Sequence, residues 1–142
     1  MKSTSLLLVA LLALPVSGAY AQASSVASQL SAASKSMAGR GWVQAERDLA
    51  GKLNDDARTD WTIYLVKNVE YSILGFCDND CKDMDLILFD ENNNKIAEDT
   101  TTDDVPVVSV TPKWTGRFTL RVLMDDCATN PCNYGVRIFS RR

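Results

Sequence analysis

The sequence predicts an all-β fold, a sandwich or a barrel, over most of the 142-residue chain. From Trp42 onward, apolar and polar residues alternate with a period of two, which is typical of half-buried strands. The strand-like runs are short, and Asn, Asp, Gly and Pro residues separate them at turns. Because no helix-period segment lies between these runs, a parallel sheet with crossover helices is not expected.

The alternation places seven or eight strands along one domain, residues 42–142. In the clearest run, Trp61, Ile63 and Leu65 occupy every second position, which predicts that all three face the core. The other predicted strands lie at residues 49–53, 69–73, 86–88, 105–110, 118–124 and 134–138, of which the first has the weakest pattern.

Residues 1–21 carry the features of a signal peptide. Lys2 supplies a positive charge, residues 6–14 form an unbroken apolar run, and Ala19-Tyr20-Ala21 is a small-x-small cleavage pattern. The alternative is an N-terminal membrane anchor, but the apolar run is too short to span a bilayer stably. The pattern looks bacterial, so we expect a periplasmic or secreted protein with no membrane span.

Residues 22–41 form a leader that is rich in Ser and Ala. Its apolar residues fall at helical spacing and are Val26, Leu30, Ala33 and Met37. Gly39 follows them as a residue that closes helices. Because this apolar stripe is thin, we expect either a weakly docked helix, which we favour, or a flexible segment.

The composition excludes several classes of function. The chain has no histidine, which rules out Ser-His-Asp triads, Cys-His dyads and His-ligated zinc or haem. It has 15 basic and 18 acidic residues, a mildly acidic balance that argues against nucleic acid as a partner. Ten of the acidic residues but only two of the basic ones lie in residues 78–104, so we expect an acidic end of the sandwich, where loops gather.

The four cysteines form two close pairs in the sequence, Cys77 with Cys81 and Cys127 with Cys132. In an exported chain an even number of cysteines indicates disulfides, and four cysteines allow three connectivities. We predict the local one, Cys77–Cys81 and Cys127–Cys132. The alternative is a zinc site of four thiolates, but the spacings differ from the usual C-x2-C pairs, and an oxidising compartment preserves thiolates poorly.

Several motifs together carry a resemblance to a known family. They are GFCDNDC at 75–81, DMDLILFD at 83–90, PVVSVTP at 106–112, GRFTLRV at 116–122, and Cys127 followed by PCNYGV at 131–136. On these motifs, residues 71–139 resemble the bacterial pre-peptidase C-terminal domain family, in a small, stand-alone exported variant with two cysteine pairs. The resemblance implies a jelly-roll-like antiparallel β-sandwich. Members are usually appended to secreted exoenzymes, and some bind calcium, collagen or polysaccharide.

A cluster of acidic residues is the candidate metal site. Its members are Asp78, Asp80, Asp83, Asp85 and Asp90. Carboxylate oxygens suit calcium, and the resemblance implies a calcium role for Asp83 and Asp85, which would point to one face of a strand. The alternative is a solvated acidic loop. Residues 90–95 fail as an EF-hand loop, because Lys95 stands where glycine is needed, and predict a hairpin turn instead. We predict no other cofactor.

Three residues are candidate ligand contacts, Trp114, Arg117 and Arg121. Trp114 lies in a predicted turn, where its ring would stack on a sugar or a peptide side chain. The alternative, which we favour, is that it caps the open edge of the core. Arg117 and Arg121, with Arg137, are expected on one outward sheet face, as a cationic strip or simply as a solubilising surface.

No enzyme signature is present in the sequence, which lacks G-x-S-x-G, a phosphate-binding loop and the Asp-Thr-Gly of aspartic proteases. We therefore expect a non-catalytic, exported β-sandwich module that binds a protein or glycan at the cell envelope or outside it. A calcium-dependent structural or interaction domain is the alternative. A small hydrolase that uses a pair of carboxylates is a third and weaker alternative.

Overall fold

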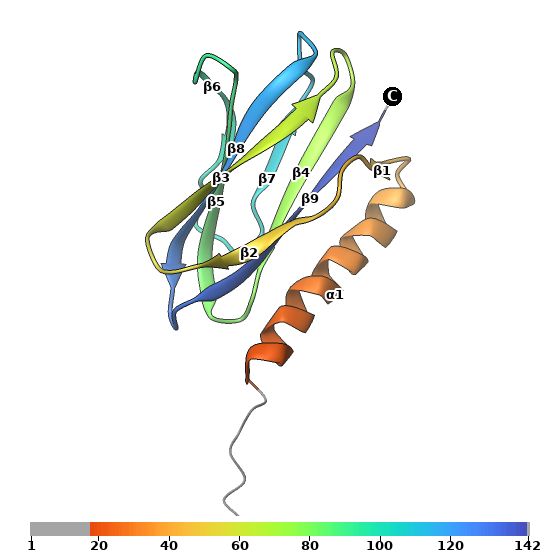
Figure 1. The fold of residues 1–142 in the computed structure, drawn as a ribbon. Helices are drawn as coiled ribbons and strands as arrows, with labels where there is room; N and C mark the ends of the chain where they lie inside the picture. Colours follow the sequence, from red (N-terminus) through yellow and green to blue (C-terminus); the bar gives the residue numbers. More distant parts are fainter. Residues whose placement is uncertain (1–17, 142) are drawn as a thin grey trace, which may run out of the picture.

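The computed structural model describes residues 18–141, and the side chains of residues 25–141. Nearly all of the predicted signal peptide lies outside this range. Helix α1 (Gly18–Ala38) is followed by strands β1 (Val43–Gln44), β2 (Leu49–Leu53), β3 (Ala57–Leu65), β4 (Glu70–Cys77), β5 (Cys81–Phe89), β6 (Lys95–Asp99), β7 (Val107–Val110), β8 (Gly116–Cys127) and β9 (Cys132–Arg141). The predicted all-β sandwich is confirmed (Figure 1).

The strands form two antiparallel sheets that pack face to face. Sheet A has the order β1-β9-β4-β7, with β2 also paired to β9, and sheet B has the order β3-β8-β5-β6. Strand β2 pairs with β9, β3 with β8, β4 with β7 and β5 with β6, so that first and last strands pair and the others nest inside them. This nested pairing is that of a jelly roll.

Two of these strands were not expected from the sequence. Strand β1 has two residues and pairs with the end of β9, next to β2, so that β1 and β2 form one interrupted edge strand. Strand β6 is a mostly exposed edge strand with no apolar alternation, so periodicity alone does not reveal it. The predicted hairpin turn between β5 and β6 is confirmed, and Asn93 there has a φ of 62°.

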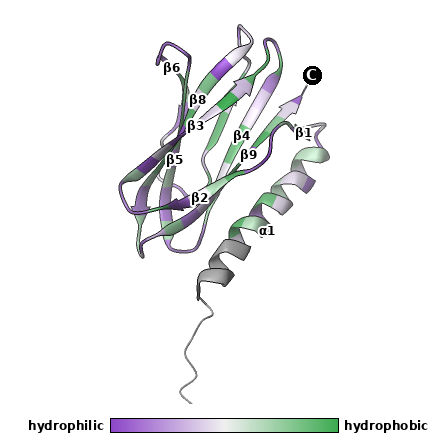
Figure 2. Ribbon diagram, viewed as in Figure 1, coloured by the Kyte–Doolittle hydropathy of each residue, from purple (hydrophilic) through white to green (hydrophobic). Residues whose placement is uncertain are grey.

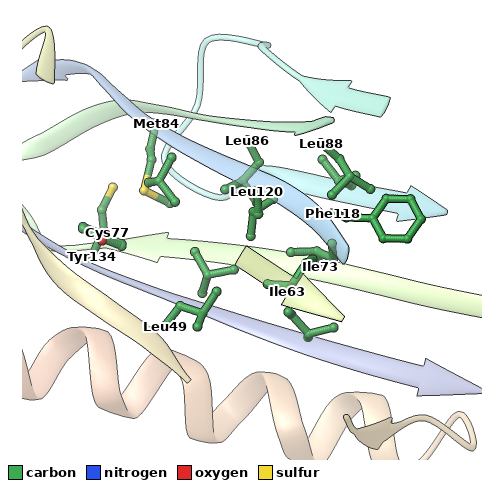
Figure 3. Close-up of a cluster of buried hydrophobic side chains, with 14 of the residues drawn as sticks. Leu49, Ile63, Ile73, Cys77, Met84, Leu86, Leu88, Phe118, Leu120 and Tyr134 are labelled. Atoms are coloured by element: carbon green, nitrogen blue, oxygen red, sulfur yellow. The ribbon is translucent and has the colours of Figure 1, made fainter. Parts of the chain in front are cut away.

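The main core lies between the two sheets. Figure 3 shows its side chains there, with α1 on the far side of β9. The alternate residues of the predicted strands are almost inaccessible, among them Ile63, Leu65, Ile73, Leu86, Leu88, Phe118, Leu120, Val136 and Ile138. Met84, which precedes the predicted strand at 86–88, is fully buried as well. Trp61 is only partly buried, and its indole Nε1 donates a hydrogen bond to the Tyr134 hydroxyl at 3.1 Å.

Helix α1 covers the outer face of sheet A, beside β9 and β4 (Figure 1). Val26 and Leu30 pack against Phe76 in a second, smaller cluster. The helix approaches β9 so closely that a Cβ at Gly135 would lie 2.9 Å from both Leu30 Cδ1 and Val26 Cγ1, so any side chain there would displace these two helix side chains. Figure 2 shows apolar and polar residues mixed along the helix, as its thin apolar stripe predicts.

Helix α1 ends at Ala38, directly before Gly39, where the sequence predicted its end. Gly41, rather than Gly39, adopts the left-handed conformation, with a φ of 80°. The chain turns there, and the Trp42 amide donates a hydrogen bond back to the Met37 carbonyl at 3.1 Å. No helix within residues 18–141 is both long enough and apolar enough to cross a membrane.

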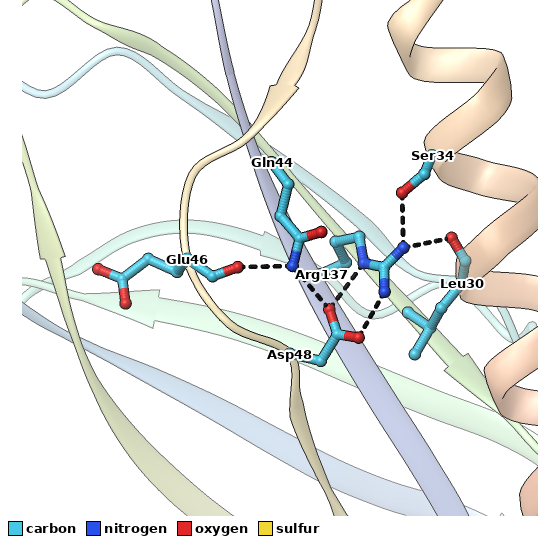
Figure 4. Close-up of polar contacts among 6 residues, drawn as sticks. All are labelled: Leu30, Ser34, Gln44, Glu46, Asp48 and Arg137. Carbon is cyan, nitrogen blue, oxygen red and sulfur yellow. Dashed lines mark hydrogen bonds and ion pairs between the residues drawn. The ribbon is translucent and has the colours of Figure 1, made fainter.

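Arg137 of β9 ties α1 to the sandwich (Figure 4). Its guanidinium donates to both carboxylate oxygens of Asp48, which precedes β2, and to the Leu30 carbonyl and the Ser34 hydroxyl of the helix. Arg117 and Arg121 lie on β8 in sheet B, whereas Arg137 lies in sheet A. The expectation that the three arginines share one sheet face is therefore wrong, because alternation assigns a residue to a face only within its own sheet.

Candidate functional site

The two predicted disulfides are present, Cys77–Cys81 and Cys127–Cys132, each with a Cα–Cα distance of 5.9 Å. Cys81 lies directly opposite Cys127 in the pairing of β5 with β8. Both bridges therefore lie at the same end of the sandwich. Each closes a short loop, so its main effect is to rigidify that loop locally.

Asp78 has a structural role at this end. It is almost completely buried, and its Oδ2 accepts hydrogen bonds at 2.7 Å from both the amide and the side-chain nitrogen of Asn133. The backbone carbonyl of the neighbouring Asp80 accepts a hydrogen bond from the Ala128 amide at 2.8 Å. These contacts hold the first disulfide loop against the second.

Asp90 lies at the opposite end of the nine-residue strand β5, roughly 23 Å from Asp83 along the strand. Its carboxylate accepts hydrogen bonds from the side-chain and backbone nitrogens of Asn94 and from the Asn92 amide, which hold its pKa below the ordinary value. Asp90 therefore closes the β5–β6 turn. The acidic stretch expected at one end is therefore divided, because Asp90 lies at the β5–β6 turn whereas Asp83, Asp85, Asp99 and Asp103 lie together.

Asp83 and Asp85 point to the outer face of sheet B, because Met84, Leu86 and Leu88 alternate with them into the core. They are only 7% and 8% exposed, and Asp83 Oδ1 is buried without a hydrogen-bond partner. The neighbouring carboxylates complete what we term the acidic cluster, which comprises Asp83, Asp85, Asp99, Asp103, Asp125 and Asp126.

The acidic cluster favours uptake of a proton. Burial, followed by repulsion from Asp125, raises the pKa of Asp83, and burial together with repulsion from Asp83 raises the pKa of Asp85 to about 6. Asp99 behaves differently, because hydrogen bonds from Thr101 and the Val107 amide lower its pKa. In the part of the chain with described side chains, no three acidic or cysteine residues converge in an arrangement that would hold a metal ion.

Arg121 is held within the protein surface. Its Nε and Nη2 each lie 2.8 Å from a carboxylate oxygen of Asp60 on β3, and its guanidinium lies 4.9 Å from the centroid of the Phe89 ring. The ion pair raises the pKa of Arg121 and lowers that of Asp60. The Asp60 pair therefore occupies Nε and Nη2 of Arg121 and holds the guanidinium over Phe89.

Trp114 lies over the edge of the core and also forms part of a cavity. Its ring stacks on Phe118, with centroids 5.5 Å apart and an interplanar angle of 22°. Its indole Nε1 is buried without a hydrogen-bond partner. The Trp114 cavity, as we term it, has a volume of about 200 Å³ and is lined by Ile96, Val110, Thr111, Pro112, Lys113, Trp114 and Phe118.

The turn that carries Trp114 is anchored on both sides to the β3–β4 turn. The Lys67 amide donates a hydrogen bond to Thr115 Oγ1, and the Asn68 amide donates one to the Pro112 carbonyl, each at 2.9 Å. Because both anchors flank Trp114, the cavity wall is held in place without a ligand.

Arg117 lies close to the Trp114 cavity but lines a different depression. That depression is polar and also contains Glu91 and Thr119, and the two hollows share Phe118 as a common wall. Arg117 is exposed, and within residues 25–141 it forms no ion pair. Of the three predicted contact residues, Trp114 and Arg117 thus lie at one end of the sandwich and remain accessible.

Two further residues of this end were not identified from the sequence. Lys113 adjoins Trp114. Its position beside a tryptophan in a predicted turn is the sequence feature from which it could have been identified. Ile96 comes from β6, the strand without apolar alternation, so no sequence signal placed it there.

Comparison with known proteins adds no relative. No family model matches the chain, and no curated protein matches its sequence.

Proposed function

We propose that this protein is a non-catalytic binding module that acts in the periplasm or outside a bacterial cell and presents the Trp114 end of its sandwich to a protein or glycan. The observation that carries the proposal is the Trp114 cavity, an apolar hollow with a few polar groups at its edge. Binding sites in proteins commonly have this composition.

Two features of the cavity favour a binding role over simple capping of the core. Trp114 is only partly buried, so its ring still offers surface to a ligand. The anchored turn also removes most of the entropic cost of ordering the wall when a ligand binds. The two disulfides support the exported location, because such bridges persist in oxidising compartments.

The test is recovery of a partner from bacterial envelope extract, using the full chain and its Trp114→Ala and Trp42→Ala variants. Both variants remove a partly buried tryptophan, and circular dichroism checks that each remains folded. We expect the same partner with the wild type and Trp42→Ala, and its loss with Trp114→Ala. Equal recovery with all three proteins would refute the proposed binding end.

We further propose that the chain belongs to the pre-peptidase C-terminal domain family. The nested strand order and the two local disulfides support this assignment at the level of the fold. The assignment does not by itself specify a ligand, because such sandwiches carry different sites.

The second candidate function is a calcium-dependent structural or interaction domain. The observation that favours it is Asp83 Oδ1, which is buried beside Asp85 without a hydrogen bond, unlike the carboxylate of Asp78. A thermal melt in calcium and in chelator tests it. Since no three acidic residues with described side chains are arranged to hold a metal ion, this candidate requires the carboxylates around Asp83 to move together when calcium binds. On this candidate, calcium raises the melting temperature of the wild type but not that of an Asp83→Asn/Asp85→Asn variant. An unchanged wild-type melting temperature would eliminate this candidate.

A further inference from the structure

The size and walls of the Trp114 cavity limit the group that it can take. Ile96, Val110, Pro112, Trp114 and Phe118 supply apolar walls around a volume of about 200 Å³. An apolar cavity of about 150 Å³ holds one benzene ring in another protein. The cavity therefore accommodates one ring or a short branched chain, but not an extended polymer.

The charge at the cavity is positive. Lys113 is the only charged residue among those that line it. Lys113 is exposed and, among the residues with described side chains, belongs to no ion pair. Glu91 Oε2 and Trp114 Nε1 both lie within 3.8 Å of the Cβ position at Gly116, but Glu91 lines the neighbouring polar depression together with Arg117 and not the Trp114 cavity. An anionic group at the mouth would thus meet an unpaired ammonium.

The positions of the cation and of the apolar wall are linked. Lys113 and Trp114 are neighbours in the turn whose two flanking residues, Pro112 and Thr115, accept hydrogen bonds from the β3–β4 turn. The backbone that carries the ammonium is therefore held against the backbone that carries the ring. This anchoring fixes the spacing of the two backbones, from which the flexible Lys113 side chain extends.

We propose that the Trp114 cavity binds a small apolar group that carries a carboxylate, with the ring or chain between Trp114 and Ile96 and the carboxylate at Lys113. This inference rests on the proposed binding function and specifies the class of ligand for the same site. The carboxylate belongs either to a free organic acid or to the C-terminal residue of a peptide, which share this chemistry.

The probe is 3-phenylpropanoate, and the matched neutral probe is 3-phenylpropanamide, which has the same ring and chain without the charge. Binding to the full chain is followed by the NMR resonances of the three indole N–H groups, assigned with a Trp114→Phe variant. We expect the carboxylate to shift the Trp114 resonance selectively and to bind about fivefold more tightly than the amide, the advantage expected for an exposed ion pair. A short peptide ending in phenylalanine, compared with its C-terminal amide, distinguishes a peptide end from a free acid.

Lys113→Gln and Lys35→Gln form a matched pair of variants, since each removes one exposed positive charge and Lys35 lies on α1. We expect Lys113→Gln to abolish the preference for the carboxylate and Lys35→Gln to retain it. If the amide binds as tightly as the carboxylate, or if the preference survives in Lys113→Gln, the charge inference is overturned and the binding function stands. If neither probe shifts the Trp114 resonance, the cavity does not bind small apolar carboxylates. The binding function is then decided separately, by whether Trp114→Ala still recovers the partner from envelope extract.

Discussion

The contact between Arg137 and Asp48 should contribute more to stability than any ion pair on sheet B. The perturbation is a double-mutant cycle with Asp48→Asn, Arg137→Met and the combined variant. The Arg137 side chain is 14% exposed and that of Asp48 is 30% exposed, and the pair is joined by two hydrogen bonds in the fork geometry of a guanidinium. Its atoms are therefore less screened by water than those of a surface pair.

The magnitude follows from these contacts. Hydrogen bonds to charged groups contribute about 1.5–3 kcal/mol each in favourable cases, and partial exposure reduces this value. We expect a coupling free energy of about 2 kcal/mol between Arg137 and Asp48. Arg137→Met alone should lower the free energy of unfolding by about 3 kcal/mol, because it also removes the hydrogen bonds to Leu30 and Ser34 of α1.

Urea denaturation followed by tryptophan fluorescence measures the cycle, and Asp60→Asn with Arg121→Met supplies the control. That pair has the same fork geometry, but its side chains are 24% and 43% exposed. We expect a coupling of about 1 kcal/mol or less there. Hydrogen exchange should also show faster opening of α1 in Arg137→Met. A coupling at Arg137 no larger than that at Arg121, with α1 equally protected, would refute the reasoning.

The remaining predictions concern pH, helix packing and the disulfides. The pKa of Asp85 is raised to about 6 in the folded protein, so its contribution to stability is present below about pH 4 and is lost as the pH rises through 6. The melting temperature should therefore rise as the pH is lowered from about 6.5 to 4.5, and Asp85→Asn should flatten this rise. A Gly135→Val variant should lower the free energy of unfolding by about 2 kcal/mol in urea denaturation, because its side chain would overlap α1; a change below about 0.5 kcal/mol would contradict the close packing. Replacing Cys127 and Cys132 together by serine should lower the free energy of unfolding by roughly 2 kcal/mol in the same assay, because the bridge closes a short loop. A loss twice as large would indicate that the bridge stabilises more than its own loop.

The period-two alternation was sufficient to predict most of the strands. The inward positions it selected in the clearest strands, such as Ile63, Leu86 and Leu120, are buried, because a strand places alternate side chains on opposite faces whatever its partners are. The disulfide pairing also followed from local spacing, since each bridge spans a short loop. The asparagine-rich turn after β5 was predictable for the same reason, because its geometry depends on neighbours in the chain.

The roles of the individual polar residues followed from tertiary structure. Asp78, Asp83 and Asp90 look equivalent in the sequence. In the structure, Asp78 holds a disulfide loop, Asp83 is buried with one carboxylate oxygen lacking a partner, and Asp90 closes a turn. Arg137 and Arg121 share the same strand-like context, yet only Arg137 meets a helix. Their partners are distant in the chain, Asp48 being 89 residues from Arg137.

The sequence by itself therefore determined the class of fold, the inward face of most strands and the cysteine pairs. Only the tertiary structure decided which strands become neighbours, where α1 docks, and that Lys113, Trp114 and Ile96 surround one cavity. The physical reason is the sequence separation over which each kind of interaction acts. Alternation, turn propensity and short-loop closure act between residues close in the chain, whereas a site is assembled by packing between segments that the chain order leaves far apart.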